Sequence, residues 1–417
     1  MYDQSPERPF GPYPCDESIV PDYTLPDPLL RADGMRVVTA QEWMNHQRAA
    51  ILDVFKKYEY GEIIPNPEIL WFEQITRRDD ALDGLAIRKE IRIHVGMANG
   101  RTASFDMLLY LPRAAEEHPV PAFIGLNFKG NHATTIEEDV RPTGLDMQDN
   151  ADDATVREHR GIQATRWCFK ETISRGYASA TICYHDIFRD QVGHGQESIF
   201  RLFYDQVVME EVNETYTPIG AWAWGLSRGF DCLAAQKGIL QGSIAVHGHS
   251  RLGKTSLWAG AIDQRFAMVI SNDSGCCGGA LHRRKYGENL SQHFQSHLNY
   301  KVPIWFVNKL DEYLWREEEL PFDQHELMAL SAPRPLAIAT ATDDQAADPR
   351  GEFLAAKAAS EVYRLFGSKG LPADDMPAPD VNITGDISFH YRTGKHDQTP
   401  QDWAHYLDLA DIYLAKN

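Results

Sequence analysis

Residues 243–261, SIAVHGHSRLGKTSLWAGA, join a β-branched apolar run directly to a segment that can form a helix. Where a strand turns sharply into a helix, a serine is held in a strained conformation, and small neighbours let its hydroxyl project above the sheet. Gly248 lies two positions before Ser250, but Leu252 takes the place of the usual second glycine, and Gly253 follows one position later. The segment predicts a nucleophile elbow at Ser250, with an ordinary glycine-rich turn as the alternative.

Apolar runs of strand length recur on both sides of this segment, separated by stretches long enough for a helix. They are VPAFIGLNF (120–128), YASATICYH (177–185), FAMVISNDS (266–274) and RPLAIATAT (334–342). Continuous apolar runs are typical of parallel strands buried on both faces. Upstream, IRKEIRIHV (87–95) and ASFDMLLYLP (103–112) alternate and predict an antiparallel hairpin. Together these patterns predict an α/β fold of the α/β-hydrolase type, a three-layer sandwich with helices on both faces of a mostly parallel, twisted central sheet.

By composition, the chain divides into an arm and one domain. Residues 1–35 hold many prolines and few periodic apolar positions, which indicates an extended arm laid over the body. Residues 36–417 begin with a helix-like segment at 44–61, show no repeat or linker, and are interpreted as a single catalytic domain. An acidic stretch at 149–161 separates two core strands and indicates a surface insertion near 131–165.

Composition and charge limit the classes of partner. The chain has 417 residues, of which 43% are hydrophobic and 24% charged, so it can bury a large core. Lys and Arg total 41 against 60 Asp and Glu, and the net charge of −19 disfavours nucleic acid and anionic membrane surfaces. No apolar run reaches the length of a membrane span, and the first residues lack the basic flank and apolar core of a secretory signal. We therefore expect a soluble chain that binds neither nucleic acid nor membrane.

The six cysteines are dispersed and show no C-x-x-C spacing, which predicts neither a zinc site nor a dense disulfide framework. Cys276 and Cys277 are adjacent, an arrangement that rarely suits a mutual bridge. Either could pair with a distant partner such as Cys232, and buried free thiols are the alternative. We expect no metal and no cofactor, because a serine can supply the nucleophile.

A serine nucleophile of this kind needs an acid and a histidine, which follow it in that order. His396 lies in the sequence FHYRTGKHDQTPQDW (389–403), just before a predicted final helix. His390 is the competing histidine. It follows the strand-like VNITGDISF (381–389) and is interpreted as a structural or rim residue.

Two aspartates can orient His396, and each follows a predicted strand. Asp273 comes after FAMVISN, and Asp344 comes after PLAIATAT. The carboxylate would accept the imidazole N–H, fix its tautomer and stabilise the imidazolium. Taken alone, each aspartate is more often a helix cap or a turn residue.

These residues resemble the glucuronoyl esterases of carbohydrate esterase family 15, especially the bacterial branch. The elbow GHSRLGK (248–254) carries the Ser-Arg-x-Gly-Lys signature of that family, and the resemblance runs from about Pro121 to the C-terminus. Three further segments resemble its Glu-Ser-Gly segment, its catalytic histidine loop and the turn after its third strand. They are SNDSGCCGG (271–279), GKHDQTPQDW (394–403) and GLNFKGNH (125–132).

The resemblance implies a role for each matching residue. Ser250 would be the nucleophile, His396 the base, and Arg251 would stabilise the oxyanion through its backbone N–H and guanidinium. Asp273 stands where many members have the longer glutamate, so Asp344 is predicted to be the principal acid and Asp273 a secondary one. A salt bridge on the helix is the alternative role for Arg251.

The resemblance also implies substrate contacts. Lys254 would hydrogen-bond the hydroxyls of the glucuronate ring, unless it is an ordinary exposed helix lysine. Glu288, in KYGENLSQ, would bind sugar hydroxyls, and Trp305, in VPIWFVNK, would support the pocket or merely fill the core. Ala346 replaces a tryptophan that bacterial members commonly have, so an aromatic surface for the substrate is expected to be missing.

We therefore expect a serine esterase that hydrolyses esters of (4-O-methyl-)glucuronic acid, as in glucuronoxylan and lignin–carbohydrate linkages, through an acyl-enzyme. A carbohydrate acetyl (acetylxylan) esterase is the nearest alternative, because the same triad cleaves acetyl groups. A carbohydrate-binding protein that keeps the fold without catalysis is the other. The resemblance implies secretion or a periplasmic location, whereas the start of the chain shows no signal.

Overall fold

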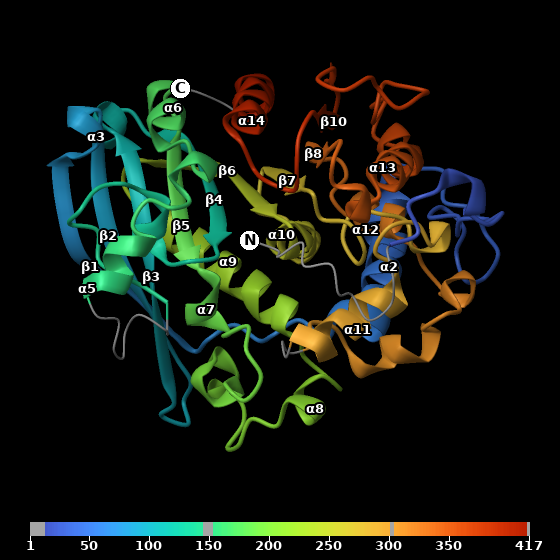
Figure 1. Ribbon diagram of the computed structural model, residues 1–417, viewed down its shortest axis with the longest axis horizontal. Helices are drawn as coiled ribbons and strands as arrows, with labels where there is room; N and C mark the ends of the chain where they lie inside the picture. Colours follow the sequence, from blue (N-terminus) through green and yellow to red (C-terminus); the bar gives the residue numbers. More distant parts are fainter. Residues whose placement is uncertain (1–12, 145–152, 301–303, 415–417) are drawn as a thin grey trace.

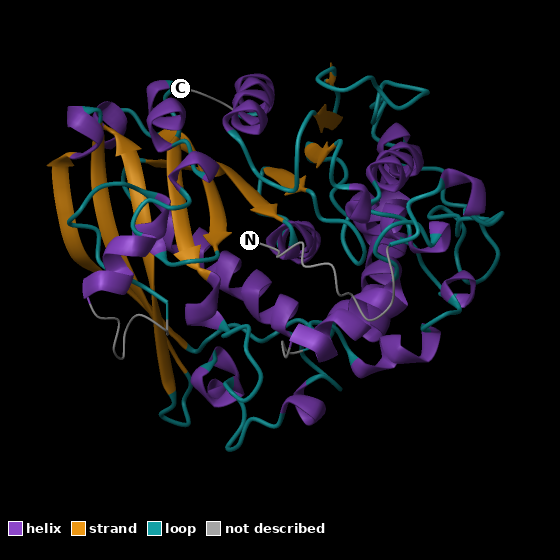
Figure 2. Ribbon diagram, in the orientation of Figure 1, coloured by secondary structure: helices purple, strands orange, loops and turns teal. Residues whose placement is uncertain are grey.

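The computed structural model describes residues 13–144, 153–300 and 304–414, and its centre is one ten-stranded sheet (Figures 1 and 2). Across the sheet the strand order is β1-β2-β3-β5-β4-β6-β7-β8-β10-β9. The strands are β1 (Ile69–Asp80), β2 (Ala86–Gly96), β3 (Thr102–Pro112), β4 (Val120–Asn127), β5 (Ala178–Cys183), β6 (Ile239–His249), β7 (Met268–Asn272), β8 (Leu336–Ala341), β9 (Asn382–Ile383) and β10 (Ile387–Arg392).

The pairing confirms a mostly parallel sheet with an antiparallel entry. β5, β4, β6, β7, β8 and β10 run parallel to one another, while β1, β2 and β3 form an antiparallel meander whose last strand pairs antiparallel with β5. The predicted hairpin is β2 and β3, and the five continuous apolar runs are β4 to β8. The short β9 closes the far edge by pairing antiparallel with β10.

Helices cover both faces of the sheet and complete the three layers. α6 and α14 pack on one face, in clusters that include Trp167 and Trp403 respectively, and α9, α10, α12 and α13 lie on the other. The α-helices are α1 (Ala40–Glu42), α2 (Arg48–Phe55), α3 (Ala81–Gly84), α5 (Asp153–His159), α6 (Phe169–Ser174), α7 (Tyr184–Ile187), α8 (Met209–Val212), α9 (Pro218–Ala234), α10 (Arg251–Ile262), α11 (Leu290–Tyr300), α12 (Gln324–Ala329), α13 (Pro349–Arg364) and α14 (Pro400–Tyr413).

The helix predicted at 44–61 is present as a continuous helical stretch that includes α1 and α2. Two π-helical turns, Trp43–Gln47 and Lys56–Tyr60, interrupt the α-helical pattern, and Gly61 ends the stretch with a φ of 80°. Within the described part of the chain, no helix combines the length and apolar character needed to cross a membrane.

The arm and the insertion lie partly outside the described residues, at 1–12 and 145–152 respectively. The described part of the arm contains one short 3-10 turn, Glu17–Ile19, and contacts the body. For example, Glu17 pairs with Arg284 at 2.6 Å. The division into an arm, a single domain and an insertion remains a prediction.

Candidate active site

Ser250 occupies the sharp turn between β6 and α10, as the sequence predicts. Its φ of 59° and ψ of −130° are unfavourable for a residue with a Cβ, and its backbone N–H donates to the carbonyl of Asn272 at 2.8 Å. A Cβ on Gly248 would lie 1.9 Å from the carbonyl oxygen of Leu252. The turn therefore requires glycine two positions before the serine.

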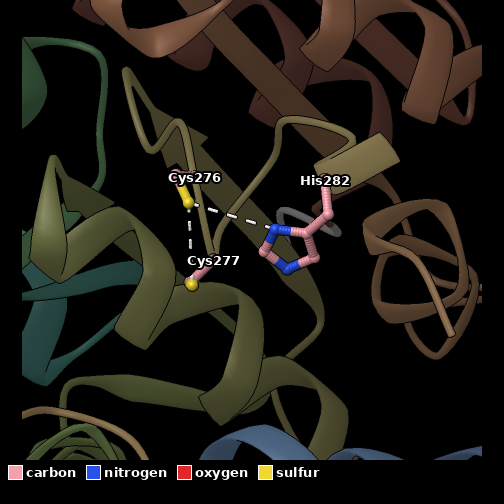
Figure 3. A group of neighbouring side chains, drawn as sticks. All are labelled: Cys276, Cys277 and His282. Carbon is pink, nitrogen blue, oxygen red and sulfur yellow. Dashed lines mark hydrogen bonds between the residues drawn. The ribbon is translucent and has the colours of Figure 1, made fainter. Parts of the chain in front are cut away.

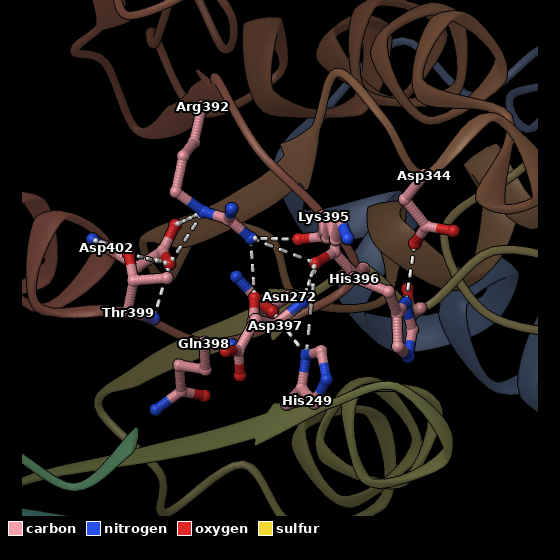
Figure 4. Close-up of polar contacts among 12 residues, drawn as sticks. His249, Asn272, Asp344, Arg392, Lys395, His396, Asp397, Gln398, Thr399 and Asp402 are labelled. Carbon is pink, nitrogen blue, oxygen red and sulfur yellow. Dashed lines mark hydrogen bonds and ion pairs between the residues drawn. The ribbon is translucent and has the colours of Figure 1, made fainter. Parts of the chain in front are cut away.

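His396 and Asp344 are joined by a hydrogen bond across the carboxyl ends of the strands (Figure 4). The distance from His396 Nδ1 to Asp344 Oδ2 is 2.6 Å. The ring of His249, which precedes the nucleophile, lies 4.5 Å from that of His396 between centroids. Burial, followed by the charge of His396, lowers the pKa of His249, so this neighbouring ring stays neutral. A carboxylate at Nδ1 fixes the tautomer that leaves Nε2 able to accept a proton.

Asp273 lies near the same histidine, but its hydrogen-bond partners are elsewhere. One ligand atom from each of Asp273, Asp344 and His396 lies within 4.8 Å of the other two. Asp273 Oδ2, however, accepts from Arg392 Nη2 and from the backbone N–H of Asp397, both at 3.3 Å. Burial and then the charge of Asp344 raise the pKa of Asp273, against the effect of Arg392. The geometry favours Asp344 as the direct partner of His396.

Arg392 braces the loop that carries His396, a role that no sequence motif indicates. Its Nη2 donates to the carbonyls of Lys395 at 3.0 Å and Asp397 at 2.6 Å, and its Nε lies 3.0 Å from Asp402 Oδ2 (Figure 4). His390 contacts the same network through Asp402. It is 1% exposed, hydrogen-bonds Asn382, and lies 3.2 Å from Asp402, as a structural histidine would.

Arg251 is held by two residues from other parts of the chain. Its guanidinium forms an ion pair with Asp190 and lies over the ring of Trp305, 4.5 Å from the centroid. Trp305 Nε1 also donates to Asp190 Oδ1 at 2.8 Å. The salt bridge considered for Arg251 is thus present, but its partner lies in the loop after α7 and not on the helix.

Trp305 is 4% exposed, so it fills the core, and its ring also supports Arg251.

Lys254 is also 4% exposed, and its Nζ donates to the carbonyl of Ser274 at 2.5 Å. The alternative that Lys254 is an ordinary exposed helix lysine is therefore wrong.

Glu288 lies just before α11, beside the described end of the arm. Its Oε2 is 3.2 Å from His293 Nδ1, and its Oε1 accepts from the Tyr13 hydroxyl at 3.4 Å. Its backbone N–H donates to the carbonyl of Ala346 at 2.8 Å. The candidate sugar-binding carboxylate thus touches both the arm and the segment after Asp344.

Cys232, Cys276 and Cys277 are free thiols, so the pairing considered between Cys232 and the adjacent cysteines is wrong. Cys232 lies in α9, whereas Cys276 and Cys277 lie in the loop between β7 and α11, and each of the three is buried.

Comparisons with known proteins show the family to which the chain belongs. The family model described as glucuronyl esterase, fungi, matches residues 162–367. A carbohydrate esterase from an unknown prokaryotic organism is 41% identical over 406 residues, which is 96% of this chain and 91% of that protein. A promiscuous esterase of carbohydrate esterase family 15 from the marine bacterial metagenome is 39% identical with a TM-score of 0.85, over 96% of this chain and 100% of that one. The chain belongs to carbohydrate esterase family 15.

A solved glucuronoyl esterase from Solibacter usitatus is similar over the same length. It is 36% identical with a TM-score of 0.86, over 95% of this chain and 100% of that chain. Membership of carbohydrate esterase family 15 makes the protein a carboxylic ester hydrolase with the α/β-hydrolase fold.

Proposed function

We propose that the protein hydrolyses esters of (4-O-methyl-)glucuronic acid, as in glucuronoxylan and lignin–carbohydrate linkages, with Ser250, His396 and Asp344 as its catalytic triad. The 2.6 Å hydrogen bond between His396 and Asp344 carries the proposal, because it supplies an oriented base in a fold whose elbow presents Ser250. The solved glucuronoyl esterase relative supports glucuronic acid as the acyl group of the substrate.

In the proposed reaction, Ser250 Oγ attacks the ester carbonyl carbon while His396 Nε2 takes the hydroxyl proton. The carbonyl oxygen becomes an oxyanion, and Asp344 stabilises the imidazolium. Collapse of this intermediate breaks the bond to the alcohol, which leaves with the proton from His396. A water molecule then attacks the acyl-enzyme in the same way, releasing the glucuronic acid and restoring Ser250.

Arg251 is suited to stabilise the oxyanion. It is the first residue of α10, where backbone N–H groups and the helix dipole favour negative charge. Asp190 and Trp305 hold its guanidinium in one position, so no reorganisation is needed as charge develops.

Lys254 and Glu288 are proposed to bind the sugar ring. The ammonium of Lys254 has three N–H donors, so its bond to Ser274 leaves donors for ring hydroxyls. Glu288 offers acceptor oxygens for the same hydroxyls. The substrate ester is neutral, whereas the glucuronate product is an anion. The net charge of −19 would help to expel this product.

The test is a hydrolysis panel in which benzyl, allyl and methyl glucuronate esters are compared with acetylated xylose and acetylxylan. We expect the glucuronate esters to have the higher kcat/KM. A preference for acetyl esters would instead support the acetyl esterase. Ser250→Ala should fold normally and keep less than about a hundredth of the activity. Failure of wild-type Ser250 to react with a fluorophosphonate would support the non-catalytic alternative.

A further inference from the structure

Two adjacent thiols and an imidazole meet in the buried loop between β7 and α11 (Figure 3). Cys276 Sγ lies 3.8 Å from Cys277 Sγ and 3.9 Å from His282 Nδ1. All three donor atoms lie within 4.8 Å of one another. The residues are only 3%, 0% and 4% exposed, respectively, and the proposed reaction uses none of them.

The spacing of these donors matches a tetrahedral metal site. Two sulfur ligands bound to Zn²⁺ at about 2.3 Å lie about 3.8 Å apart, and a sulfur and a nitrogen ligand lie about 3.6 Å apart. The sulfur atoms already have that separation, and the imidazole needs to move by only a few tenths of an ångström. We propose that Cys276, Cys277 and His282 form a binding site for a thiophilic cation such as Zn²⁺.

The backbone holds the two neighbouring cysteines in an unusual conformation. Cys277 has a φ of 52°, which is unfavourable for a residue with a Cβ, and Gly275 has a φ of 57°. The hydroxyl of Tyr60 donates to the carbonyl of Cys277 at 2.9 Å and keeps this turn in place. Both sulfur atoms thereby come close to His282, although side chains of adjacent residues in a strand point to opposite faces.

The second nitrogen of His282, Nε2, faces the side chains of Gln324 and Glu59. His282 Nε2 lies 3.6 Å from Glu59 Oε1 and 2.6 Å from Gln324 Nε2. The Gln324 amide also donates to both oxygens of Glu59, at 3.0 Å and 2.9 Å. In this structure Nε2 accepts from the Gln324 amide, and the Glu59 carboxylate at 3.6 Å is beyond hydrogen-bond distance. Binding of the metal to Nδ1 requires the ring proton to lie on Nε2, where Glu59 is the nearby carboxylate that can accept it and orient the ring. Glu59 is therefore a positioning residue.

The bound cation would stabilise a loop that supports the active site. The loop begins after β7 with Asp273 and Ser274, which accepts from Lys254, and continues to Glu288. None of the three ligands takes part in the proposed reaction, so the proposal does not depend on the proposed function. Three protein ligands leave one tetrahedral position for a water molecule.

The test is the zinc content of the full chain, produced in zinc-supplemented medium and dialysed. We expect one zinc per wild-type chain, and its loss from Cys276→Ser, Cys277→Ser and His282→Gln. Glu59→Gln should weaken affinity about 10- to 100-fold in chelator competition. Cys232→Ser removes a buried thiol outside the site and should bind zinc like the wild type.

X-ray absorption of the zinc-loaded wild type tests the ligands even if a variant fails to fold. Two sulfur ligands at about 2.3 Å and one imidazole are expected. A wild-type chain without zinc, a shell of oxygen ligands only, or equal zinc in the cysteine variants would overturn the proposal. A metal-free wild-type chain whose mass is lower by two hydrogen atoms would also overturn the proposal, because that mass indicates a disulfide bond between Cys276 and Cys277.

Discussion

Asp344 and Asp273 both lie near His396, but their surroundings suit different tasks. Asp344 is hydrogen-bonded to the imidazole, whereas Asp273 accepts from Arg392 and from the backbone of the histidine loop. Burial raises the pKa of Asp273, and an asparagine at this position keeps an oxygen that can accept the same hydrogen bonds. We interpret Asp344 as the acid of the triad and Asp273 as a support for the loop.

Asp344→Asn is therefore expected to reduce kcat more than Asp273→Asn does. Removing the acid lets His396 take the wrong tautomer, for which losses of about 10⁴-fold are precedented. The measurement is kcat of both variants on one glucuronate ester, with folding checked by thermal melting. A larger loss from Asp273→Asn would reverse the assignment, and small single losses with a collapse in the double variant would show a shared role.

Lys254→Met tests recognition of the sugar separately from catalysis. Methionine keeps a long apolar stem in a buried site but removes the ammonium. A hydrogen bond from a charged group contributes about 1.5 kcal/mol or more, so KM for methyl glucuronate should rise about tenfold or more. Nitrophenyl acetate has no sugar to contact and serves as the control substrate. Equal losses in kcat/KM on both would assign Lys254 to structure.

At the scale of elements, the strands beside the nucleophile are those that the sequence predicts best. Nearly every position of β4, β5, β7 and β8 is buried, as is β6 from Ser243 onward, so apolar residues predominate and each run is visible without the structure. β1 is not predicted because it is an edge strand of exposed and half-exposed residues with no strict alternation. VNITGDISF, which looks like one strand, spans β9 and the start of β10.

The residues that hold the site are harder to predict than the residues that act in it. Asp190 lies 61 positions from Arg251, and Arg392 lies 119 positions from Asp273. Such ion pairs depend on how distant segments pack, whereas Ser250 and His396 stand in local motifs. Asp190 and Arg392 carry no comparable local signal.

The β6–α10 turn supplies a test at the element scale. Gly248→Ala would place a Cβ 1.9 Å from the carbonyl oxygen of Leu252, so the turn must open. We expect a loss of at least about 2 kcal/mol in the free energy of unfolding together with loss of activity. Gly242→Ala lies in the same strand, where no atom is within 4 Å of the new Cβ, and is the matched control. Urea unfolding with equal stability in the two variants would contradict a strained elbow.

At the scale of the whole molecule, buried carboxyl groups make stability depend on pH. Burial raises the pKa of Glu352 to about 8, that of Glu326 to about 8 and that of Asp186 to about 7. In the unfolded chain these groups lose their protons above about pH 4.5. Between about pH 4.5 and 8 the folded state therefore holds more protons at these groups, and their contribution to stability falls as pH rises.

Buried histidines act in the opposite direction. Burial lowers the pKa of His247 to about 3, that of His132 to about 4 and that of His405 to about 4. In the unfolded chain a histidine takes up its proton below about pH 6.5. Below that pH the unfolded state therefore binds more protons at these groups, and their contribution to stability falls as pH falls.

The free energy of unfolding is therefore expected to be highest between about pH 4.5 and 6.5, where the two contributions oppose each other, and to fall on both sides. Above about pH 6.5 the histidine contribution no longer changes with pH, whereas the carboxyl contribution falls by about 1.4 kcal/mol per pH unit for each group still protonated in the folded state. Glu352→Gln replaces one such carboxyl with a neutral amide, so urea unfolding from pH 6.5 to 8 should give a shallower decline in the free energy of unfolding.

Glu361→Gln is the control, because Glu361 is an exposed carboxylate of the same helix, α13. A wild-type stability that rises steadily from pH 6.5 to 8, or an unchanged decline in Glu352→Gln, would show that burial does not hold the proton on Glu352.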